Sequence, residues 1–503
     1  MQENRQNGHL YMPPEEYLSA LEKLINHNKD SYQMPEGDLR AFANEAFGSG
    51  EIIYSRGCIY LKNDHMNEHG CAVLMARRIA YDRSRSIVPF PGEIVSEISI
   101  SPEQESAVRM ALMHNTSIIT GGQGTGKTTT LQTLLKMYNG DKAKILLCAP
   151  TGRAARRMAE ATGYPAFTIH KSFGLGSEDS DENDTVIRRS WELVVMDEAS
   201  MADQWIMFQI LRRLSPETKL VIVGDSDQLP SVGPGNVLHE LLQVKEIPRV
   251  QLKQVFRQAA NSAIAENARR VAAKETELTY DDSFVFVPVN KQAEAMDIIC
   301  ELYKRASSKL GADKVQILTP QRKNGECGAN TLNTIIQMMI QGNVKAGKKV
   351  FNDYFCVGDP VIQIKNQKGI YNGDIGVVSE AMPNVKVDFP SLDLSRTYDN
   401  EALQMLELAY ALTVHKSQGS EYPIVIIPVL REHRFMLTRN LFYTAISRGK
   451  QRVVLVGRKS AIKKAILTED TSKRLTLLAS RIQRELSRME NKLCVSEKIK
   501  ESA

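Results

Sequence analysis

The sequence predicts an α/β fold in which two units with parallel sheets follow one another along the chain. Three observations support this prediction. The chain has 503 residues, and a single hydrophobic core rarely organises more than about 250–300 residues. Short runs rich in β-branched residues alternate with helix-compatible stretches, which is typical of parallel strands joined by helical crossovers. These runs form two groups, one on each side of residues 249–257.

The composition is that of an ordinary globular protein, with 42% hydrophobic and 24% charged residues. The net charge of +5 permits nucleic-acid binding but does not by itself argue for it. Seven cysteines are scattered without a CxxC pair, which indicates reduced thiols and a cytoplasmic location. The longest apolar runs, such as Ile145–Pro150, have the length of a strand, so no membrane span is expected.

A small N-terminal α+β domain with its linker is expected over residues 1–100. Residues 14–47 have apolar side chains at helical spacing, Ile52–Leu61 alternates like a short hairpin, and Glu68–Tyr81 predicts a second helix. Ile87–Ile100 is rich in Pro, Gly and Ser and is expected to be the linker. No motif with a recognisable chemistry occurs in this region.

The first α/β unit is expected over residues 101–250 and the second over residues 251–470. Strands of the first unit are predicted at Ser117–Thr120, Ile145–Ala149, Leu193–Met196 and Lys219–Val223. Strands of the second unit are predicted at Phe284–Val289, Val315–Thr319, Ile424–Val429 and Arg452–Val456. The helix-compatible stretches between them predict a parallel sheet in each unit.

Three segments depart from this alternation. Gly174–Arg189 is polar, acidic over GSEDSDEND and then basic, and is expected to be a short insertion in the first unit. Residues 351–398 contain short β patterns and Gly turns, which predict a small all-β module inside the second unit. Residues 471–503 form a charged helical tail, for which a solvated helix is the favoured interpretation.

A phosphate-binding loop is predicted at Gly121–Thr128, which reads GGQGTGKT and matches GxxxxGK(S/T) in full. An apolar run precedes it and an amphipathic helix follows, so a Gly-rich turn without function is the weaker interpretation. Backbone N–H groups of the loop and the start of the helix favour phosphate. Lys127 is expected to reach the β- and γ-phosphates of ATP, and the Thr128 hydroxyl to hold Mg²⁺. The residues of this loop expected to bind the nucleotide are Gly122, Gly124, Thr125, Gly126, Lys127, Thr128 and Thr129.

Two further strands end in polar side chains. Leu193–Ser200 reads LVVMDEAS, which places Asp197 to hold Mg²⁺ and Glu198 to polarise the attacking water. An apolar run followed by Asp-Glu is a weak signal alone, but it is strong at this distance after a phosphate loop. Val221–Pro230 reads VIVGDSDQLP and places Gln228 near the γ-phosphate. Because ends of parallel strands share one edge of a sheet, the three motifs are expected to converge on one crevice.

Taken in order, these three stretches and six others resemble the motifs of superfamily 1 helicases of the RecD-like branch. The six others are SPEQESAV at Ser101–Val108, CAPTGRAARRM at Cys148–Met158, TIHKSF at Thr168–Phe173, QVFRQ at Gln254–Gln258, AYALTVHKSQGSEY at Ala409–Tyr422 and RNLFYTAISRGK at Arg439–Lys450. The resemblance implies that both units are RecA-like P-loop domains. It also implies that residues 351–398 are an SH3-like clamp on the strand and that residues 174–189 are a short wedge that splits the duplex.

The resemblance assigns further residues to the nucleotide. Gln104 is expected to contact adenine, Glu421 to lie at the nucleotide, and Arg257 and Arg448 to act as arginine fingers on the triphosphate. Gln104 also fits a capping box with Ser101 as N-cap, and one side chain cannot fully serve both roles. The two arginines could also be ordinary surface residues; the finger role is favoured for both.

The same resemblance assigns a set of residues to the nucleic-acid strand. Most of them follow strand ends on the predicted groove, where phosphate contacts position the strand. The arginines and Lys416 could instead be solvated charges, and the two histidines could be packing or hydrogen-bonding residues. The residues expected to contact the strand are Pro150, Thr151, Arg153, Arg156, His170, Lys171, His415, Lys416 and Gln418.

The predicted function is an ATP- and Mg²⁺-dependent helicase that moves 5′→3′ along single-stranded DNA and unwinds duplex DNA. The polarity is implied by the resemblance only. Its expected partners are single-stranded DNA and 5′-tailed duplex DNA, and repair or recombination proteins bound through the N-terminal domain. No contact with a membrane is expected. The alternative is an ATP-switched strand-binding subunit of a larger complex, against which intact Glu198 and both arginines argue. A P-loop kinase is disfavoured because it needs neither the second unit nor the HKSQG stretch.

Overall fold

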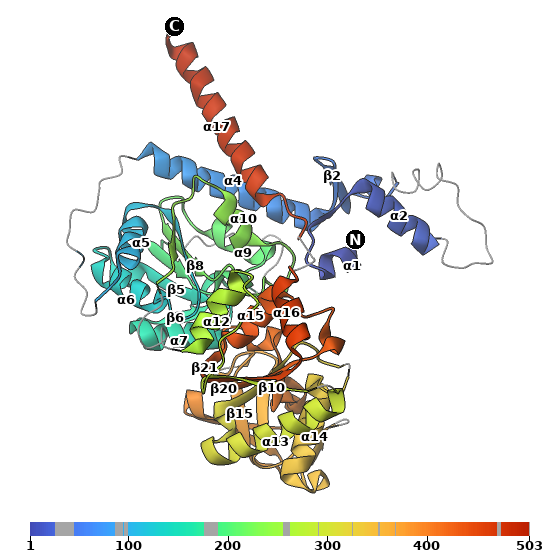
Figure 1. Cartoon of the computed structure of the whole chain (residues 1–503). Coiled ribbons are helices and arrows are strands. Elements are labelled where there is room, and N and C mark those ends of the chain that lie inside the picture. The colour runs from blue at the N-terminus through green and yellow to red at the C-terminus, as the bar shows by residue number, and fades with distance from the viewer. Residues whose placement is uncertain are drawn as a thin grey trace.

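The computed structural model is an α/β chain with two parallel sheets covered by helices (Figure 1), which confirms the predicted fold class. It describes residues 1–25, 45–85, 94, 99–175, 190–254, 262–289, 291–323, 325–350, 353–367, 369–469 and 474–501. Two predictions fall outside the described residues: the finger Arg257, and the wedge at residues 174–189 apart from Gly174 and Leu175. Most of the predicted linker Ile87–Ile100 also lies outside them.

The first sheet has the strand order β6-β5-β7-β8-β4-β9, and every neighbouring pair is parallel. Its strands are β4 (Thr116–Gly121), β5 (Ile145–Ala149), β6 (Ala166–Thr168), β7 (Leu193–Met196), β8 (Lys219–Gly224) and β9 (Arg249–Leu252). All four predicted strands are present, and β6 and β9 form the two edges. Side chains of β7 alternate between two cores, Leu193 and Val195 in one and Val194 and Met196 in the other. Both faces of the sheet are therefore covered.

Helices of the first unit connect these strands. They are α5 (Pro102–Met113), α6 (Lys127–Met137), α7 (Gly152–Thr162), α8 (Ile169–Phe173), α9 (Gln204–Arg213) and α10 (Val237–Gln243). α6 and α7 begin shortly after β4 and β5, which brings their N-termini to the carboxyl edge of the sheet. A side-chain cap fixes the start of α7, because the Thr151 hydroxyl accepts a hydrogen bond from the Ala154 N–H at 3.2 Å.

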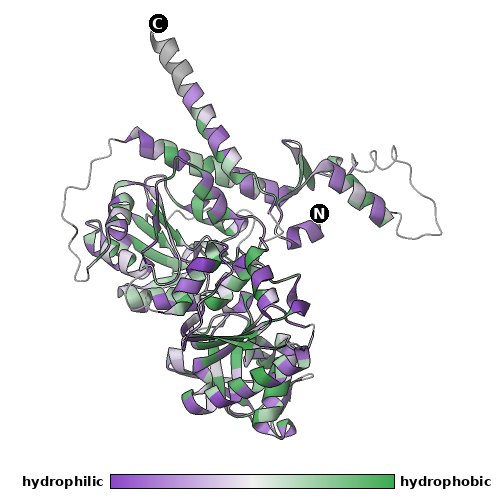
Figure 2. Cartoon of the chain, in the orientation of Figure 1, coloured by the Kyte–Doolittle hydropathy of each residue, from purple (hydrophilic) through white to green (hydrophobic). Residues whose placement is uncertain are grey.

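The second sheet has the order β10-β21-β20-β11-β19 and is again wholly parallel. Its strands are β10 (Phe284–Pro288), β11 (Val315–Thr319), β19 (Ala411–Thr413), β20 (Tyr422–Val429) and β21 (Gly449–Gly457). The helices of this unit are α12 (Ala263–Ala272), α13 (Gln292–Leu310), α14 (Ala329–Gln341), α15 (Arg439–Ile446) and α16 (Lys459–Leu467). Hydrophobic residues gather on the strands, whereas the outer helices carry hydrophilic residues (Figure 2). All four predicted strands of this unit are present, and β19 is additional.

An antiparallel sheet interrupts the second unit between α14 and β19. Its order is β17-β16-β15-β14-β18, with β14 (Pro360–Gln363), β15 (Ile375–Glu380), β16 (Val385–Phe389), β17 (Leu394–Tyr398) and β18 (Leu406–Leu408). A short pair, β12 (Lys348–Val350) and β13 (Asp353–Phe355), precedes it. The buried Asp359 carboxylate ties this β insertion to α14, because it accepts from the Gln341 amide at 2.9 Å. The region is antiparallel β structure, while its SH3-like character and its boundaries stay predictions.

The described N-terminal elements include a small antiparallel sheet and the helices that flank it. They are α1 (Gln2–Gln6), β1 (Tyr11–Met12), α2 (Pro14–Ile25), β2 (Ile52–Ser55), β3 (Cys58–Leu61) and α4 (Lys62–Ser84), with the strand order β1-β3-β2. α4 begins earlier than the predicted Glu68 and packs against α9. Its Cys71, Met75 and Ile79 belong to the same hydrophobic core as the first sheet. α4 therefore shares its hydrophobic core with the first unit, although the sequence places it in the N-terminal domain, which is predicted to end at residue 100.

The C-terminal helix α17 (Leu478–Glu501) differs from the predicted solvated tail. Its first turns pack on α4 and α10, and Leu478, Ile482 and Leu486 are buried in the core of the first unit. The reason is their spacing of four residues, which places them on one face of the helix. Solvation is therefore the wrong interpretation for this part of the tail. None of the helices in the described ranges is long and apolar enough to cross a membrane.

Candidate active site

The phosphate loop between β4 and α6 adopts a conformation that requires glycine. Gly124 and Gly126 have φ angles of 75° and 79°, in the left-handed region that glycine tolerates best. A Cβ atom on Gly121 would lie 2.5 Å from Thr125 Oγ1. Gly126 is the N-cap of α6, so the first N–H groups of α6 lack an intrahelical partner and are open to an anion. The local backbone is therefore suited to phosphate.

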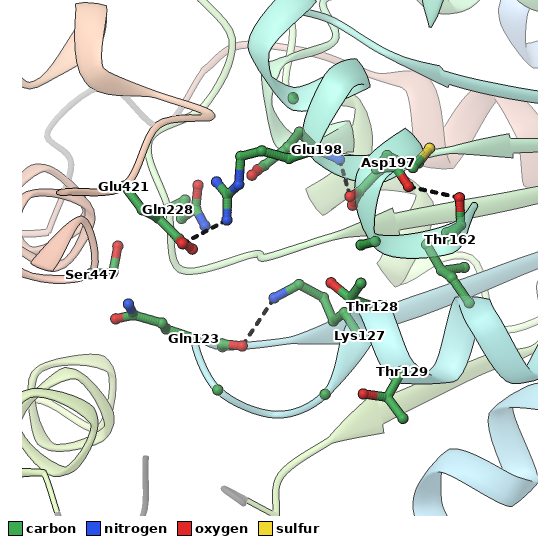
Figure 3. Close-up of a pocket in the computed structure, with 18 of the residues that line it drawn as sticks. Gln123, Lys127, Thr128, Thr129, Thr162, Asp197, Glu198, Gln228, Glu421 and Ser447 are labelled. Atoms are coloured by element: carbon green, nitrogen blue, oxygen red, sulfur yellow. Dashed lines mark hydrogen bonds and ion pairs between the residues drawn. The ribbon is translucent and has the colours of Figure 1, made fainter. Parts of the chain in front are cut away.

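A cavity of about 420 Å³ opens over this loop (Figure 3). Six of the seven loop residues predicted to bind the nucleotide line it: Gly122, Gly124, Gly126, Lys127, Thr128 and Thr129. Thr125 does not line it, because its hydroxyl donates to the Gly122 carbonyl at 2.9 Å and braces the loop. The Lys127 ammonium donates to the same carbonyl at 2.9 Å, which holds the charge over the loop.

Asp197 and Glu198 reach the cavity from the end of β7 (Figure 3). Glu198 has a φ angle of 52°, unusual for a residue other than glycine, and its N–H donates to Asp197 Oδ1 at 2.8 Å. Burial and the adjacent Glu198 charge raise the pKa of Asp197. A cation beside the pair would relieve both effects. Asp197 and the Thr128 hydroxyl supply oxygen donors to one cavity, and such donors fit Mg²⁺.

The second unit forms the opposite wall of the cavity with Glu421, Ser447 and Arg448. Arg448 is 3% exposed, and its guanidinium donates to the backbone carbonyls of Ser420 at 3.1 Å and Thr444 at 3.3 Å. These bonds fix a cation at the start of β21, where the two units meet. The cavity therefore combines one wall with a lysine and two carboxylates and another wall with an arginine.

The loop that follows β8 is clamped between the two units. Gln228 of this loop lines the cavity, at the position where the sequence predicts a γ-phosphate contact. The next residue, Leu229, donates its N–H to the Thr444 hydroxyl at 2.8 Å and accepts from the Gln418 amide at 3.1 Å. Gln418 is a predicted strand contact, but here its buried amide joins the units. Movement at Gln228 is therefore linked directly to the second unit.

Replacing Tyr443 by Phe is expected to destabilise the contact between the units by roughly 1–3 kcal/mol. The Tyr443 hydroxyl donates to the buried Asp225 carboxylate at 2.8 Å across the cleft, and its loss leaves that carboxylate one donor short. The shift of the denaturation midpoint measures this cost. Tyr303→Phe is the matched control, because the buried Tyr303 hydroxyl has no hydrogen-bond partner in the described part of the chain. Equal shifts for both variants would contradict the assigned contact.

Arg153 and Arg156 of α7, two predicted strand contacts, are bonded to the second unit in this structure. Arg156 donates to Asp374 of the β insertion through two bonds of 3.4 Å. Arg153 donates to Ser420 Oγ at 3.1 Å and stacks over the Tyr422 ring at 5.1 Å. The reason is that α7 begins at the edge of the first sheet that faces the second unit. Contact with a strand stays a prediction, and it requires these bonds to open.

Arg157 is a cavity residue that the sequence alone does not assign to the nucleotide site. It lines the cavity, and its guanidinium lies 2.6 Å from the carboxylate of Glu421, which the Lys450 ammonium approaches at 3.1 Å. Burial alone would raise the pKa of Glu421, but Arg157 and Lys450 lower it to about 2. No motif spacing connects residues so distant in the chain. The pair joins the two units directly beside the phosphate loop.

Gln104 lies behind the phosphate loop, not among the residues that line the cavity. Its side-chain oxygen accepts from the Ser101 N–H at 2.8 Å, and its backbone N–H donates to Ser101 Oγ at 3.2 Å, which completes the capping box. Its side-chain nitrogen donates to the Gly126 carbonyl at 3.1 Å. The structure thus uses Gln104 to cap α5 and to brace the loop, and the adenine contact stays a prediction.

Two predicted strand contacts, His170 and Lys171, lie on the short helix α8. The His170 ring packs against Trp205 of α9, with ring centroids 6.4 Å apart. The Lys171 ammonium lies 4.9 Å from the centre of the Phe167 ring. Aromatic rings beside cationic groups are typical of surfaces that bind single strands.

The remaining predicted strand contacts lie at the ends of strands in both units. Pro150 and Thr151 connect β5 to α7, and Thr151 caps that helix. His415 and Lys416 lie in the short turn after β19. The Lys416 ammonium is bound by Glu407 of the β insertion at 2.7 Å, so a phosphate would have to compete with this carboxylate. Their contact with a strand stays a prediction.

The chain is similar to known helicases and to two protein families. Residues 99–285 match the AAA domain family, and residues 408–456 match the UvrD-like helicase C-terminal domain family. The chain is 32% identical over 451 residues to the ATP-dependent RecD2 DNA helicase of Deinococcus radiodurans, covering 89% of this chain and 61% of that protein. The crystal structure of Pif1 helicase from Candida albicans is similar with a TM-score of 0.45 and 20% identity, over 78% of this chain and 100% of that chain.

The chain thus spans less than two thirds of the Deinococcus radiodurans protein. A second relative is covered more fully. The chain is 30% identical over 429 residues to the RecBCD enzyme subunit RecD of Mycolicibacterium smegmatis, covering 76% of this chain and 75% of that protein. On this match, together with the AAA domain and the UvrD-like helicase C-terminal domain, the chain belongs to the RecD family.

Proposed function

We propose that this chain is an ATP-dependent DNA helicase that moves 5′→3′ along single-stranded DNA and unwinds duplex DNA. The observation that carries the proposal is the cavity between the units, in which Lys127 and Glu198 of the first unit meet Arg448 of the second. A nucleotide site split between two units can open and close as ATP is bound and hydrolysed. The Deinococcus radiodurans relative is named an ATP-dependent DNA helicase. The polarity is supported by the resemblance of nine ordered motifs to the RecD-like branch.

Each wall of the cavity has a proposed chemical role. The loop N–H groups and Lys127 bind the β- and γ-phosphates of ATP. Asp197 and Thr128 hold Mg²⁺, which supplies positive charge to the phosphates when bound. Glu198 orients and polarises the attacking water, and Arg448 offsets the charge that develops on the transferred phosphoryl group.

Coupling of hydrolysis to movement is proposed to run through the clamped loop after β8. Gln228 contacts the γ-phosphate, while the neighbouring Leu229 is bonded on both its N–H and its carbonyl to the second unit. Loss of the γ-phosphate then alters the balance between open and closed positions of the units. The strand is held mainly through phosphate contacts and stacking, so that its sequence matters little.

ATP hydrolysis with and without single-stranded DNA tests the proposal. The wild-type protein is expected to hydrolyse ATP faster when the strand is present. Lys127→Ala is expected to lose hydrolysis while it still binds the strand, because the ammonium that holds the phosphates is gone. Lys142→Ala is the matched control, since Lys142 is an exposed lysine of the same unit. Near-normal turnover of Lys127→Ala rejects the nucleotide site, and hydrolysis indifferent to DNA rejects the motor.

A second candidate function is an ATP-switched subunit that binds the strand inside a larger complex. The observation in its favour is that the Mycolicibacterium smegmatis relative is named a subunit of the RecBCD enzyme. In either case we propose that the N-terminal elements contact further repair or recombination proteins. An isolated chain that hydrolyses ATP on single-stranded DNA but separates no duplex supports the subunit over the autonomous helicase.

A further inference from the structure

A second cavity, separate from the nucleotide site, is lined by residues of the β2–β3 turn, α4 and α17. Figure 1 shows where β2, α4 and α17 lie in the fold. The volume of this cavity is about 420 Å³, as large as that of the nucleotide cavity. Its lining combines Ser55 and Glu485 with four arginines and two histidines. Burial and the charge of Arg481 lower the pKa of His65 to about 4, so the positive charge of the pocket comes from its arginines. The arginines and histidines, called the arginine pocket below, are Arg56, His65, His69, Arg481, Arg484 and Arg488.

Local structure from three separate elements directs these side chains toward one point. Arg56 and Gly57 form the two-residue turn between β2 and β3, with φ angles of 59° and 74°, as tight hairpin turns require. The three arginines of α17 are spaced three and four residues apart, so they share one face of the helix. The two histidines lie one turn apart on α4, with stacked rings 6.0 Å apart. The pocket therefore requires α17 to pack on the N-terminal elements.

Arg481 anchors the pocket. Its Nε atom donates to the Glu68 carboxylate at 2.9 Å, and its guanidinium lies over the Tyr60 ring at 5.2 Å. Glu68 is fully buried and also accepts from the Tyr60 hydroxyl at 3.0 Å and the Thr476 hydroxyl at 2.8 Å. The Glu68 carboxylate beneath the pocket is therefore engaged by Arg481 and by the chain that leads into α17.

The other arginines of the pocket have no comparable partner. Within the described ranges, the side chains of Arg56 and Arg484 have no hydrogen bond or ion pair. The Arg488 guanidinium reaches the Glu485 carboxylate only at 3.9 Å. Burial and the like charges of Arg484 and Arg481 lower the pKa of Arg56, against the opposite effect of Tyr60 and Glu68. A ligand with several negative charges would relieve this repulsion.

The arginine pocket is connected by packed helices to a predicted strand contact. α4 lies directly on α9, with Gly70 so close to the Phe208 ring that a Cβ atom would meet it at 2.3 Å. At the start of α9, Trp205 is 37% exposed and packs on His170. The helices α8, α9 and α4 thus form a continuous line from the strand-binding region to the pocket.

We propose that the arginine pocket binds the backbone phosphates of a nucleic-acid segment that extends beyond the cleft between the two units. Guanidinium groups suit this ligand, because their planar N–H forks pair with two phosphate oxygens at once. Contacts to phosphate carry no sequence information, so binding should be independent of sequence. This inference rests on the proposed helicase function. The arginine pocket would be a second binding site for the nucleic acid, away from the nucleotide site.

The test compares a double variant, Arg484→Gln with Arg488→Gln, with the wild-type full-length chain. Both side chains are exposed, and Gln keeps helix propensity while it removes the charge. Affinity is measured by fluorescence anisotropy over a series of salt concentrations, for a single strand of about 8 nucleotides and for a forked duplex with long arms. The charge-matched control is Arg305→Gln with Lys309→Gln, both exposed on α13 of the second unit.

The double variant is expected to bind the forked duplex about tenfold more weakly, with a salt slope lower by about two units, and to bind the short strand as the wild type does. Unchanged affinity for the fork, or an equal loss on both substrates, would overturn the inference. So would weaker binding of polyglutamate with unchanged binding of the fork, because the pocket would then serve an acidic protein. Failure of the proposed function is recognised separately, by wild-type hydrolysis that does not respond to single-stranded DNA. Unchanged thermal unfolding and strand-stimulated hydrolysis of the double variant verify its fold.

Discussion

Replacing Glu198 by Gln lowers ATP hydrolysis by a factor of about 10²–10⁴, while ATP binding is retained. Glu198 follows β7 in a left-handed backbone conformation and lines the cavity beside Asp197 (Figure 3). Gln has the same shape but cannot accept a proton from the attacking water. The rate of the hydrolysis step should therefore fall, while the affinity for ATP should not change. Single-turnover hydrolysis and binding of a fluorescent ATP analogue separate the two quantities.

Glu160→Gln is the matched control for this variant, because Glu160 is an exposed glutamate of the same unit. Its hydrolysis rate should equal that of the wild type. If Glu198→Gln instead loses nucleotide affinity and keeps its rate per bound ATP, Glu198 is a binding residue and another group activates the water.

Replacing Arg448 by Ala is expected to lower strand-stimulated hydrolysis by about 10³-fold, the lower end of the range for an arginine finger. The guanidinium is buried, held by two backbone carbonyls, and faces the phosphate loop from the other unit. Arg448→Lys should remain strongly impaired, because an ammonium keeps the charge but not the planar fork. Steady-state turnover at saturating DNA measures both effects.

Arg452→Ala is the control for position, because Arg452 lies on β21, which begins directly after Arg448, but bonds to the Asp282 carbonyl, away from the cavity. It should change turnover little. Nucleotide binding by Arg448→Ala has to remain measurable, since a general collapse of the cleft would also stop hydrolysis. Full activity of Arg448→Ala would exclude the finger role of Arg448.

Much of the fold follows from local patterns in the sequence. The sequence predicts four strands of the first sheet, because each is an apolar run next to a helical pattern. These strands are β4, β5, β7 and β8. β6 and β9 are missed, since β6 has three residues and β9 includes the polar Arg249 and Gln251. The packing of α17 is missed for another reason: its apolar stripe is set among many charges, and only the tertiary structure brings α4 against it.

The candidate site is predictable where its residues are neighbours in the chain. The phosphate loop is a glycine-rich turn before a helix. Asp197–Glu198 and Gln228 each follow an apolar strand. The contacts between the units are not predictable in this way. Arg157 meets Glu421, and Asp225 meets Tyr443, only because the two units come together, and no spacing in the sequence encodes these pairs.

If ATP hydrolysed between the two units drives strand separation, the protein must release one strand of a tailed duplex, and an unwinding assay measures this release. DNA duplexes with a 5′ tail, a 3′ tail or no tail are mixed with protein and ATP, and the release of a labelled strand is followed. We expect the wild type to open the 5′-tailed duplex and Lys127→Ala to open none of the three. Strand-stimulated hydrolysis without release from any duplex would contradict this link between hydrolysis and strand separation, and faster release from the 3′-tailed duplex would contradict the polarity.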